Sequence, residues 1–278
     1  MHLSAIPVND FTYGPITPIV AYAAACLGAA LGLRCTLRAM THTTTARARW
    51  LVLGAVALGT GIWTMHFIAM TGFSIESMDI DYDVPVTFAS LAVAIVVVGI
   101  GAFVVGYGGR GPVPLLCGGA ITGLGVAAMH YLGMAGMRFA GHISYDTTIL
   151  VASVVIAVVA ATVALWLAVT VTNFGAAIGC SLIMGAAVSG MHYTGMAALQ
   201  ITAAPGVGDA GRQPVAVLAP MLVGPVLLLF FVGLMVSMDP MDREQWRSER
   251  SKHKKRSQPE QHVETTASQP HRSTPTPR

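Results

Sequence analysis

The chain has 278 residues, of which 54% are hydrophobic and only 10% are charged. A soluble domain carries about 25% charged residues, so this composition excludes an ordinary water-soluble enzyme and indicates a chain surrounded mostly by lipid. The formal net charge is +3. The basic residues lie in a few loops and in the C-terminal tail, which favours a role in membrane topology over nucleic-acid binding.

Apolar runs of about 20 residues recur along the chain, and each is long enough to cross about 30 Å of hydrocarbon as a helix. No acidic or basic residue lies in the interior of these runs. Every backbone amide in lipid needs a partner within its own segment or a closed barrel, and the runs show no alternating pattern, so we expect helices. The sequence predicts an all-α, polytopic membrane protein with seven transmembrane helices. The expected spans are 15–33, 50–71, 85–106, 113–134, 148–170, 175–196 and 215–237.

The loops predict the orientation, because Lys and Arg near the ends of spans stay cytoplasmic. Of the 16 basic residues, only Arg138 and Arg212 fall in loops on the same side as the N-terminus. We therefore predict that residues 1–14 form an external N-terminal segment and that the C-terminus is cytoplasmic. Residues 238–278 are rich in Lys, Arg, Ser, Thr, Gln and Pro. They predict a disordered basic tail that lies against anionic lipid headgroups, with no nucleic acid as a partner.

Three similar hexapeptides lie near the ends of the second, fourth and sixth spans, 64 and 62 residues apart. They are Met65-His66-Phe67-Ile68-Ala69-Met70, Met129-His130-Tyr131-Leu132-Gly133-Met134 and Met191-His192-Tyr193-Thr194-Gly195-Met196. A second marker precedes the odd-numbered spans, as Tyr13-Gly14, Tyr82-Asp83 and Tyr145-Asp146. Self-similarity at a fixed interval indicates three repeated helical hairpins, followed by a seventh helix, within a membrane domain of residues 15–237. Each hairpin crosses twice, so all three motifs lie at the same depth on the same, outer side.

A histidine inside a lipid-spanning helix costs free energy unless it is paired, so the three motif histidines are candidate functional residues. We expect the three helices to bring them together around one site. On a helix, the methionine four positions later is rotated only about 40° from its histidine and can share that site. Thioether sulfur and imidazole nitrogen together suit Cu(I), which makes copper the expected cofactor. The candidate metal ligands are His66, His130, His192, Met70, Met134 and Met196.

Other motif residues are expected to pack around these ligands, because one copper ion needs fewer donors than three motifs offer. They are Met65, Met129, Met191, Tyr131 and Tyr193. In a purely structural interpretation, each histidine bonds a carbonyl or a tyrosine hydroxyl of a neighbouring helix, and each methionine fills space. Haem ligation is a third possibility, although nothing marks a large planar pocket. We find no nucleophile–base pair, P-loop or dinucleotide fingerprint, and expect no enzyme.

The three motifs and the basic loops resemble the MHYT family of bacterial integral membrane sensors, named for a tetrapeptide that stands here as residues 191–194. The resemblance covers roughly residues 13–237. It implies a signalling protein of the bacterial inner (plasma) membrane that holds copper through Met and His near the outer face and detects oxygen, carbon monoxide or nitric oxide. Many members continue into a cytoplasmic diguanylate cyclase, phosphodiesterase, kinase or DNA-binding module, whereas this sequence ends in a short polar tail and leaves its cytoplasmic signalling partner unknown.

Two other functions compete with sensing. A protein that transports or handles copper or another metal ion would place polar or thioether groups through the full thickness of the membrane, whereas these candidate ligands lie near the outer end. A structural membrane subunit would need no metal at the histidines. We expect the sensor.

Overall fold

The computed structural model describes residues 7–42, 44–76, 78, 80–171, 174–203 and 214–238. Within these residues, seven helices are long and apolar enough to cross a membrane. They are α1 (Ile16–Thr41), α2 (Thr44–Thr71), α3 (Val84–Gly108), α4 (Pro112–Ala135), α5 (Thr147–Thr170), α6 (Phe174–Ala197) and α7 (Pro214–Met238). The predicted fold class, an all-α polytopic membrane protein, is confirmed. The predicted tail beyond residue 238 and the first six residues of the external segment lie outside the described residues.

The described part of the chain also contains six short strands, which form three two-stranded antiparallel sheets. The strands are β1 (Val8–Asn9), β2 (Ser74–Ile75), β3 (Asp81–Tyr82), β4 (Met137–Arg138), β5 (Gly141–Tyr145) and β6 (Leu199–Ala203). β1 pairs with β2, β3 with β4 and β5 with β6, so each sheet joins the start of one helical hairpin to its end. The repeat is therefore β-α-α-β. We did not predict the strands, because two to five residues are too short for a clear alternating pattern.

One backbone hydrogen bond recurs at the same place in each repeat. It joins Asp83 N to Gly136 O at 2.8 Å, Asp146 N to Ala198 O at 2.8 Å, and Thr12 N to Gly72 O at 3.0 Å. Each acceptor lies six residues after a motif histidine, so Thr12 occupies the position of the two aspartates. The predicted correspondence of Tyr13 and Gly14 with the later markers was therefore wrong by two residues, and Phe11 and Thr12 are the true equivalents.

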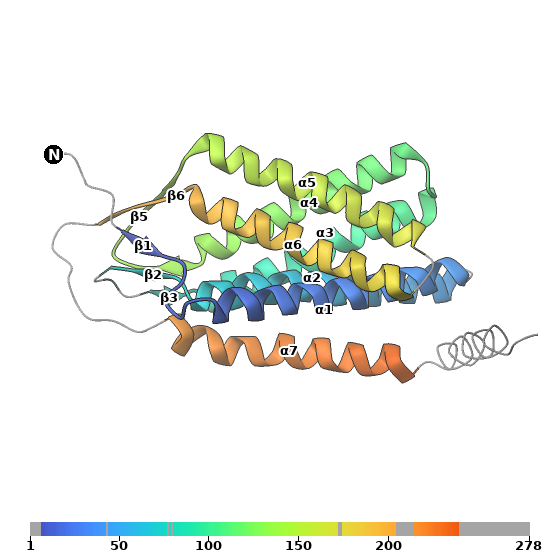
Figure 1. The fold of residues 1–278 in the computed structure, drawn as a ribbon, viewed down its shortest axis with the longest axis horizontal. Helices are drawn as coiled ribbons and strands as arrows, with labels where there is room; N and C mark the ends of the chain where they lie inside the picture. Colours follow the sequence, from blue (N-terminus) through green and yellow to red (C-terminus); the bar gives the residue numbers. More distant parts are fainter. Residues whose placement is uncertain are drawn as a thin grey trace, which may run out of the picture. The chain divides into compact units, whose positions relative to one another are not determined.

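The helices of the three hairpins run side by side along the bundle (Figure 1), and the contacts between the hairpins close a ring. α2 contacts α3, α4 contacts α5, and α6 returns to contact α1. α2 is the most buried of the seven helices. α7 lies outside the ring and packs against α1 and α2, where Leu229, Val232 and Val236 share an apolar cluster with Leu31, Cys35 and Ala57. This arrangement places the ends of α2, α4 and α6 at the strand end of the bundle, by which we mean the end that carries β1–β6.

The opposite end, here called the arginine end, holds the short connections between α1 and α2 and between α3 and α4. α1 and α2 continue there beyond the predicted limits of 33 and 50, because arginine ends an apolar run without ending a helix. The guanidinium of Arg38 lies 5.1 Å from the Trp50 ring centroid. Arg47 Nε donates to the carbonyl oxygens of Ala39 and His42, both at 3.3 Å, and so satisfies the last carbonyls of α1.

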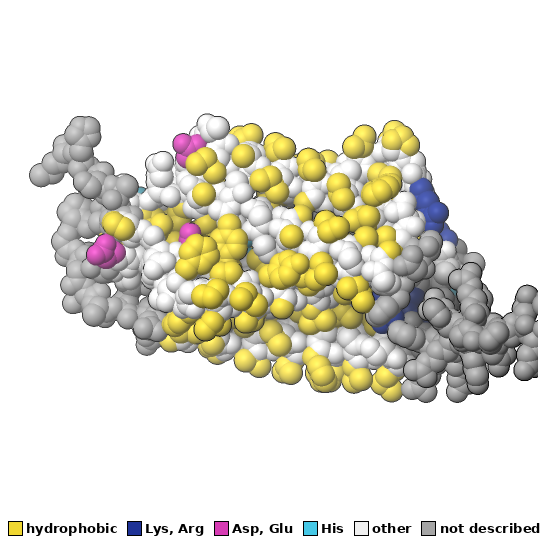
Figure 2. Space-filling view, in the orientation of Figure 1, with side chains coloured by type: hydrophobic (Ala, Val, Ile, Leu, Met, Phe, Trp, Pro, Cys, Tyr) yellow, Lys and Arg dark blue, Asp and Glu magenta, His cyan; other side chains and the backbone are white. Residues whose placement is uncertain are grey.

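The flank between the two ends is apolar. Figure 2 shows hydrophobic side chains along the length of the helices, Lys and Arg at one end, and Asp and Glu at the other. Large apolar side chains such as Val113, Val159 and Phe230 are more than half exposed. A surface of this kind is stable next to hydrocarbon and unfavourable in water, which agrees with a multi-pass membrane protein.

Candidate metal centre

The three motif histidines meet in the middle of the bundle near the strand end. Each lies five residues before the end of its helix, so the three reach the same depth. Their Nδ1 atoms face one another, at 3.0 Å between His66 and His192, 3.2 Å between His66 and His130, and 3.4 Å between His130 and His192. No more than 2% of any of the three residues is exposed. The predicted convergence on one site is confirmed.

The imidazole rings follow the threefold pattern of the repeats. Their centroids lie 4.9, 5.0 and 5.2 Å apart, and each pair of rings is inclined by 77° to 87°. In the part of the chain that the structure describes, these three residues form the group of His, Cys, Asp and Glu side chains that could hold a metal ion. No carboxylate belongs to this group, so it would bring no negative charge to a bound ion.

Three Nδ1 atoms in mutual contact cannot all be joined by hydrogen bonds. In a neutral imidazole, each Nδ1 is either a donor or an acceptor, so among three adjacent atoms at least one pair is always alike. A central cation removes this conflict if all three atoms present lone pairs to it. A point equidistant from the three atoms lies about 1.9 Å from each, close to the roughly 2 Å of metal–imidazole bonds. The geometry therefore fits a metal ion held by three Nδ1 atoms.

Metal binding through Nδ1 leaves the proton of each ring on Nε2. The Nε2 atoms of His66 and His130 are buried and have no hydrogen-bond partner among the described residues. The structural interpretation predicted that each histidine would bond a carbonyl or a tyrosine hydroxyl of a neighbouring helix. In the part of the chain that the structure describes, the polar contacts shown for the three imidazoles instead join their Nδ1 atoms to one another.

Motif glycines give two of the rings their space. A Cβ atom on Gly133 would lie 2.7 Å from Nε2 of His66, and one on Gly195 would lie 2.5 Å from Nε2 of His130. His66 and His130 therefore each pack against the glycine of the next repeat, three residues after that repeat's own histidine. The corresponding residue of the first repeat is Ala69, which is buried.

The aromatic residue after each histidine packs against it edge to face. The ring centroids lie 4.6 Å apart for His66 and Phe67, 4.8 Å for His130 and Tyr131, and 4.9 Å for His192 and Tyr193. These contacts place Tyr131 and Tyr193 beside the histidine trio. The Tyr131 hydroxyl also lies 2.6 Å from Ser153 Oγ on α5. Ser153 Oγ donates to the Leu150 carbonyl, so the tyrosine is the donor and its ring is held in place.

A second layer of aromatic residues joins neighbouring repeats between the histidine trio and the strand end. Tyr82 contacts Phe67 at 6.2 Å between centroids, Tyr145 contacts Tyr131 at 5.3 Å, and Phe11 contacts Tyr193 at 5.6 Å. In each pair, the aromatic residue at the start of one repeat covers the motif aromatic of the preceding repeat. Burial raises the pKa of Tyr145 to about 12 and keeps its hydroxyl neutral.

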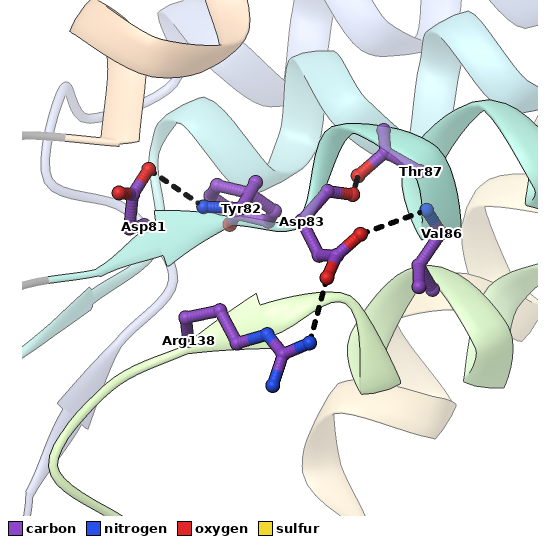
Figure 3. Close-up of polar contacts among 6 residues, drawn as sticks. All are labelled: Asp81, Tyr82, Asp83, Val86, Thr87 and Arg138. Carbon is purple, nitrogen blue, oxygen red and sulfur yellow. Dashed lines mark hydrogen bonds and ion pairs between the residues drawn. The ribbon is translucent and has the colours of Figure 1, made fainter.

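An ion pair and a helix cap hold the N-terminus of α3 (Figure 3). Asp83 Oδ1 accepts from Val86 N at 3.1 Å, and Thr87 Oγ1 donates to the Asp83 carbonyl at 2.8 Å. Arg138 from β4 donates to Asp83 Oδ2 at 2.6 Å. The Arg138 guanidinium and the Val86 amide together lower the pKa of Asp83. Arg138, one of the two basic residues predicted on the outer side, thus ties the two ends of the second hairpin together.

The six motif methionines are all buried. Met70, Met129, Met134, Met191 and Met196 belong to the large apolar cluster at the centre of the ring. Met65 instead packs between α1 and α2 with Ala21, Ala25 and Ala69. Coordination of a metal by Met70, Met134 or Met196 remains a prediction.

Comparison with known proteins identifies the family. The family MHYT, described as "Bacterial signalling protein N terminal repeat", matches residues 59–118, 123–179 and 185–245. The chain belongs to the MHYT family. The three matches begin 64 and 62 residues apart, which is the spacing of the motif histidines, so the family repeat and the structural repeat have the same length. No solved structure matches the chain.

Several curated MHYT relatives are signalling proteins. The bifunctional diguanylate cyclase/cyclic di-GMP phosphodiesterase MucR of Pseudomonas aeruginosa is 42% identical over 59% of this chain and 24% of its own length. The cyclic di-GMP phosphodiesterase NbdA of the same species is 34% identical over 70% of this chain and 25% of its own. The signaling protein YkoW of Bacillus subtilis is 30% identical over 67% and 24%. The matched region of this MHYT protein spans about a quarter of each relative and shows no catalytic domain.

Proposed function

We propose that this MHYT protein is a sensor of the bacterial inner membrane that holds one copper ion at the three histidines and responds to oxygen, carbon monoxide or nitric oxide. The observation that carries the proposal is the triangle of buried Nδ1 atoms, 3.0 to 3.4 Å apart. Three neutral donors without a carboxylate suit a singly charged, soft ion such as Cu(I) better than a hard divalent ion. Bound Cu(I) would supply a coordination position for a diatomic ligand.

The residues around the trio hold the rings in one geometry and exclude water. Phe67, Tyr131 and Tyr193 pack against the imidazole edges, and Gly133 and Gly195 close the Nε2 sides. Because the rings come from three different hairpins, a change at the centre acts on the packing of α2, α4 and α6 at once. A ligand shifts this packing only if it binds two arrangements with different affinity.

The apolar core on the arginine-end side of the trio supports sensing over transport. The residues four positions before the histidines are Ile62, Val126 and Val188, and they present no ligand atom toward the arginine end. A path for an ion would need polar or thioether groups through this layer. We propose that the signal passes through helix packing to a cytoplasmic partner in cyclic di-GMP signalling, the process that the names of MucR and NbdA specify.

Metal analysis of the purified protein tests the copper proposal. The parent, purified in detergent under reducing, copper-replete conditions, is expected to hold about one copper per chain, because three donors fit one ion of about 2 Å bond length. The triple variant His66→Ala, His130→Ala, His192→Ala is expected to lose this copper. The matched control is His142→Ala, because His142 lies on β5 outside the trio. Helicity is measured for each variant to confirm folding.

Two results would contradict the proposal. A parent without copper under these conditions would favour the structural interpretation of the histidines. Copper retention by a folded triple variant would place the metal elsewhere.

A further inference from the structure

An apolar cavity lies in the middle of the ring, on the side of the histidine trio that faces the arginine end. Its volume is about 40 Å³, and α1, α2, α4, α5 and α6 line it. Two layers of its lining come from equivalent positions in the three repeats, four and eight residues before each histidine. They are Ile62, Val126 and Val188, then Leu58, Thr122 and Met184. Residues four apart share a helix face. The cavity therefore lies on the axis of the ring, next to the trio in the direction of the arginine end.

A second cavity of about 30 Å³ continues the first toward the arginine end. Leu58, Thr122 and Met184 line both cavities. On α5, the wall of the first cavity consists of four alanines, of which Ala161 and Ala164 also line the second cavity. Protein interiors are packed closely, and empty volume destabilises a core by about 24 cal/mol per Å³. The alanines on α5 leave this space open.

The first cavity is unsuited to water. Of the described residues that line it, Thr122 is the one with a polar side chain. A buried water needs two to four polar partners. The volume exceeds the roughly 10–15 Å³ that one water-sized molecule requires. An apolar molecule of about two heavy atoms fits both the size and the lining.

A groove on the membrane-facing side of α5 and α6 adjoins this cavity. The groove has a volume of about 330 Å³, and the exposed side chains of Val155, Val159 and Ile183 line it. Three residues line both the groove and the cavity and so form the wall between them: Ala160, Met184 and Ala187. Two of them are alanines, and methionine has an unbranched, flexible side chain that can move aside.

We propose that the axial cavity binds small apolar molecules of diatomic size that dissolve in the bilayer, and that these molecules enter from lipid between α5 and α6 past Met184. Binding in the cavity needs no metal. As a supply route to the histidines, the cavity rests on the proposed function, because it delivers an apolar ligand to within one helical turn of the trio without passage through water.

Xenon is a suitable probe, because it is apolar, soluble in lipid and chemically inert. Copper-free protein in lipid nanodiscs, with ¹³C-labelled methionine methyl groups, is titrated with xenon under pressure. Met184 and Met191 line the cavity, and their methyl signals are expected to shift in a saturable manner. Met137 is buried in β4 and lines neither cavity, so its signal should not shift saturably. Equal, non-saturating shifts at all three methyl groups would overturn the proposal.

Filling the cavity tests the same site independently. Ala161→Leu occupies the space that the two cavities share, and Ala164→Val does so with a smaller side chain. Both folded variants are expected to lose the saturable shifts. Saturable shifts that persist in both variants would show that xenon binds elsewhere.

The entrance is tested by exchange of xenon between lipid and the cavity, measured by saturation transfer. Val159→Trp covers the groove without entering the cavity, and is expected to slow the exchange several-fold at unchanged occupancy. Val151→Trp is the matched control, because Val151 is also about half exposed on α5 but does not line the groove. Unchanged exchange in Val159→Trp would overturn the entrance between α5 and α6.

The two proposals fail separately. Xenon binding in a parent that holds no copper would keep the cavity site and remove the proposed function. Copper binding without saturable xenon shifts would keep the proposed function and remove the cavity site.

Discussion

At the residue scale, the repeats place equivalent side chains around one axis, but the surroundings of the three histidines are not identical. His66 and His130 each pack against a glycine of the next repeat, whereas the first repeat carries Ala69 at the corresponding position. Phe67 also stands where the other repeats have tyrosine. The three imidazoles therefore have similar geometry and different surroundings, so removal of each is expected to have a different effect on metal affinity.

A single methyl group tests how closely the rings are held. Gly195→Ala would place a Cβ 2.5 Å from His130 Nε2, a distance that forces the ring or α6 to move. We expect the variant to bind copper more weakly, because the Nδ1 triangle no longer closes. Copper affinity is measured by competition with a Cu(I) chelator of known strength.

The control is Gly190→Ala on the same helix, where nothing lies within 4 Å of the added Cβ. Its copper affinity should equal that of the parent. Equal affinity in both variants would show that the site tolerates displacement of His130.

At the element scale, aspartate caps set where two of the hairpins begin. Asp146 Oδ1 accepts from Thr148 N at 2.9 Å and from Ile149 N at 3.0 Å. Asp146 also closes its repeat through the backbone bond to Ala198. Thr12, the equivalent residue of the first repeat, is followed by a turn in which Gly14 has a φ of +60°, and α1 begins only at Ile16. The first hairpin thus starts differently from the other two.

Loss of the cap should destabilise α5 without unfolding the ring. Asp146→Ala is expected to lower stability by about 1 kcal/mol, the usual cost of removing an N-cap side chain. Asp146→Asn keeps an acceptor oxygen and should lose much less. The check is reversible unfolding in mixed detergent micelles. Equal losses in both variants would mean that the charge of Asp146 matters more than its cap.

The sequence predicted the elements of the membrane domain well where apolar length decides the structure. The ends of α3 to α7 lie within two residues of the predicted spans. The convergence of the histidines also followed from sequence, because equal spacing in repeated hairpins implies equal depth. The strands, the Ser153 contact with Tyr131 and the role of Phe11 could not be predicted in this way. They depend on contacts between segments far apart in the chain, and a serine within an apolar run gives no signal of its partner.

At the scale of the whole molecule, ring closure explains why three hairpins give one site. Each hairpin contributes one histidine, one aromatic contact to a neighbour and one sheet at the strand end. The contact of Phe11 with Tyr193 and the packing of α1 against α6 join the first repeat to the last. A single open hairpin would leave its histidine without the other two donors, so the site is a property of the closed ring.

The distribution of charge predicts which end of the ring faces the periplasm. Arg34, Arg38, Arg47, Arg49 and Arg110 lie toward the arginine end, while acidic side chains occur at the strand end. Positive charge near helix ends stays cytoplasmic, so the strand end and the histidine trio should face outward. Reporter fusions after residues 40 and 110 should behave as cytoplasmic, and a fusion after residue 140 as external. The reverse pattern would invert the topology and the position of the site.

The same orientation predicts from which side the metal can be removed. Each histidine lies five residues from the strand end of its helix, or about 7.5 Å at 1.5 Å per residue, and the arginine end is much farther away. If copper binds, a membrane-impermeant Cu(I) chelator should strip it faster from right-side-out spheroplasts than from inverted vesicles. The measurement is copper retained per chain over time, with detergent-solubilised protein as the reference for free access. Faster loss from inverted vesicles would place the trio near the cytoplasm, in conflict with the charge of the loops.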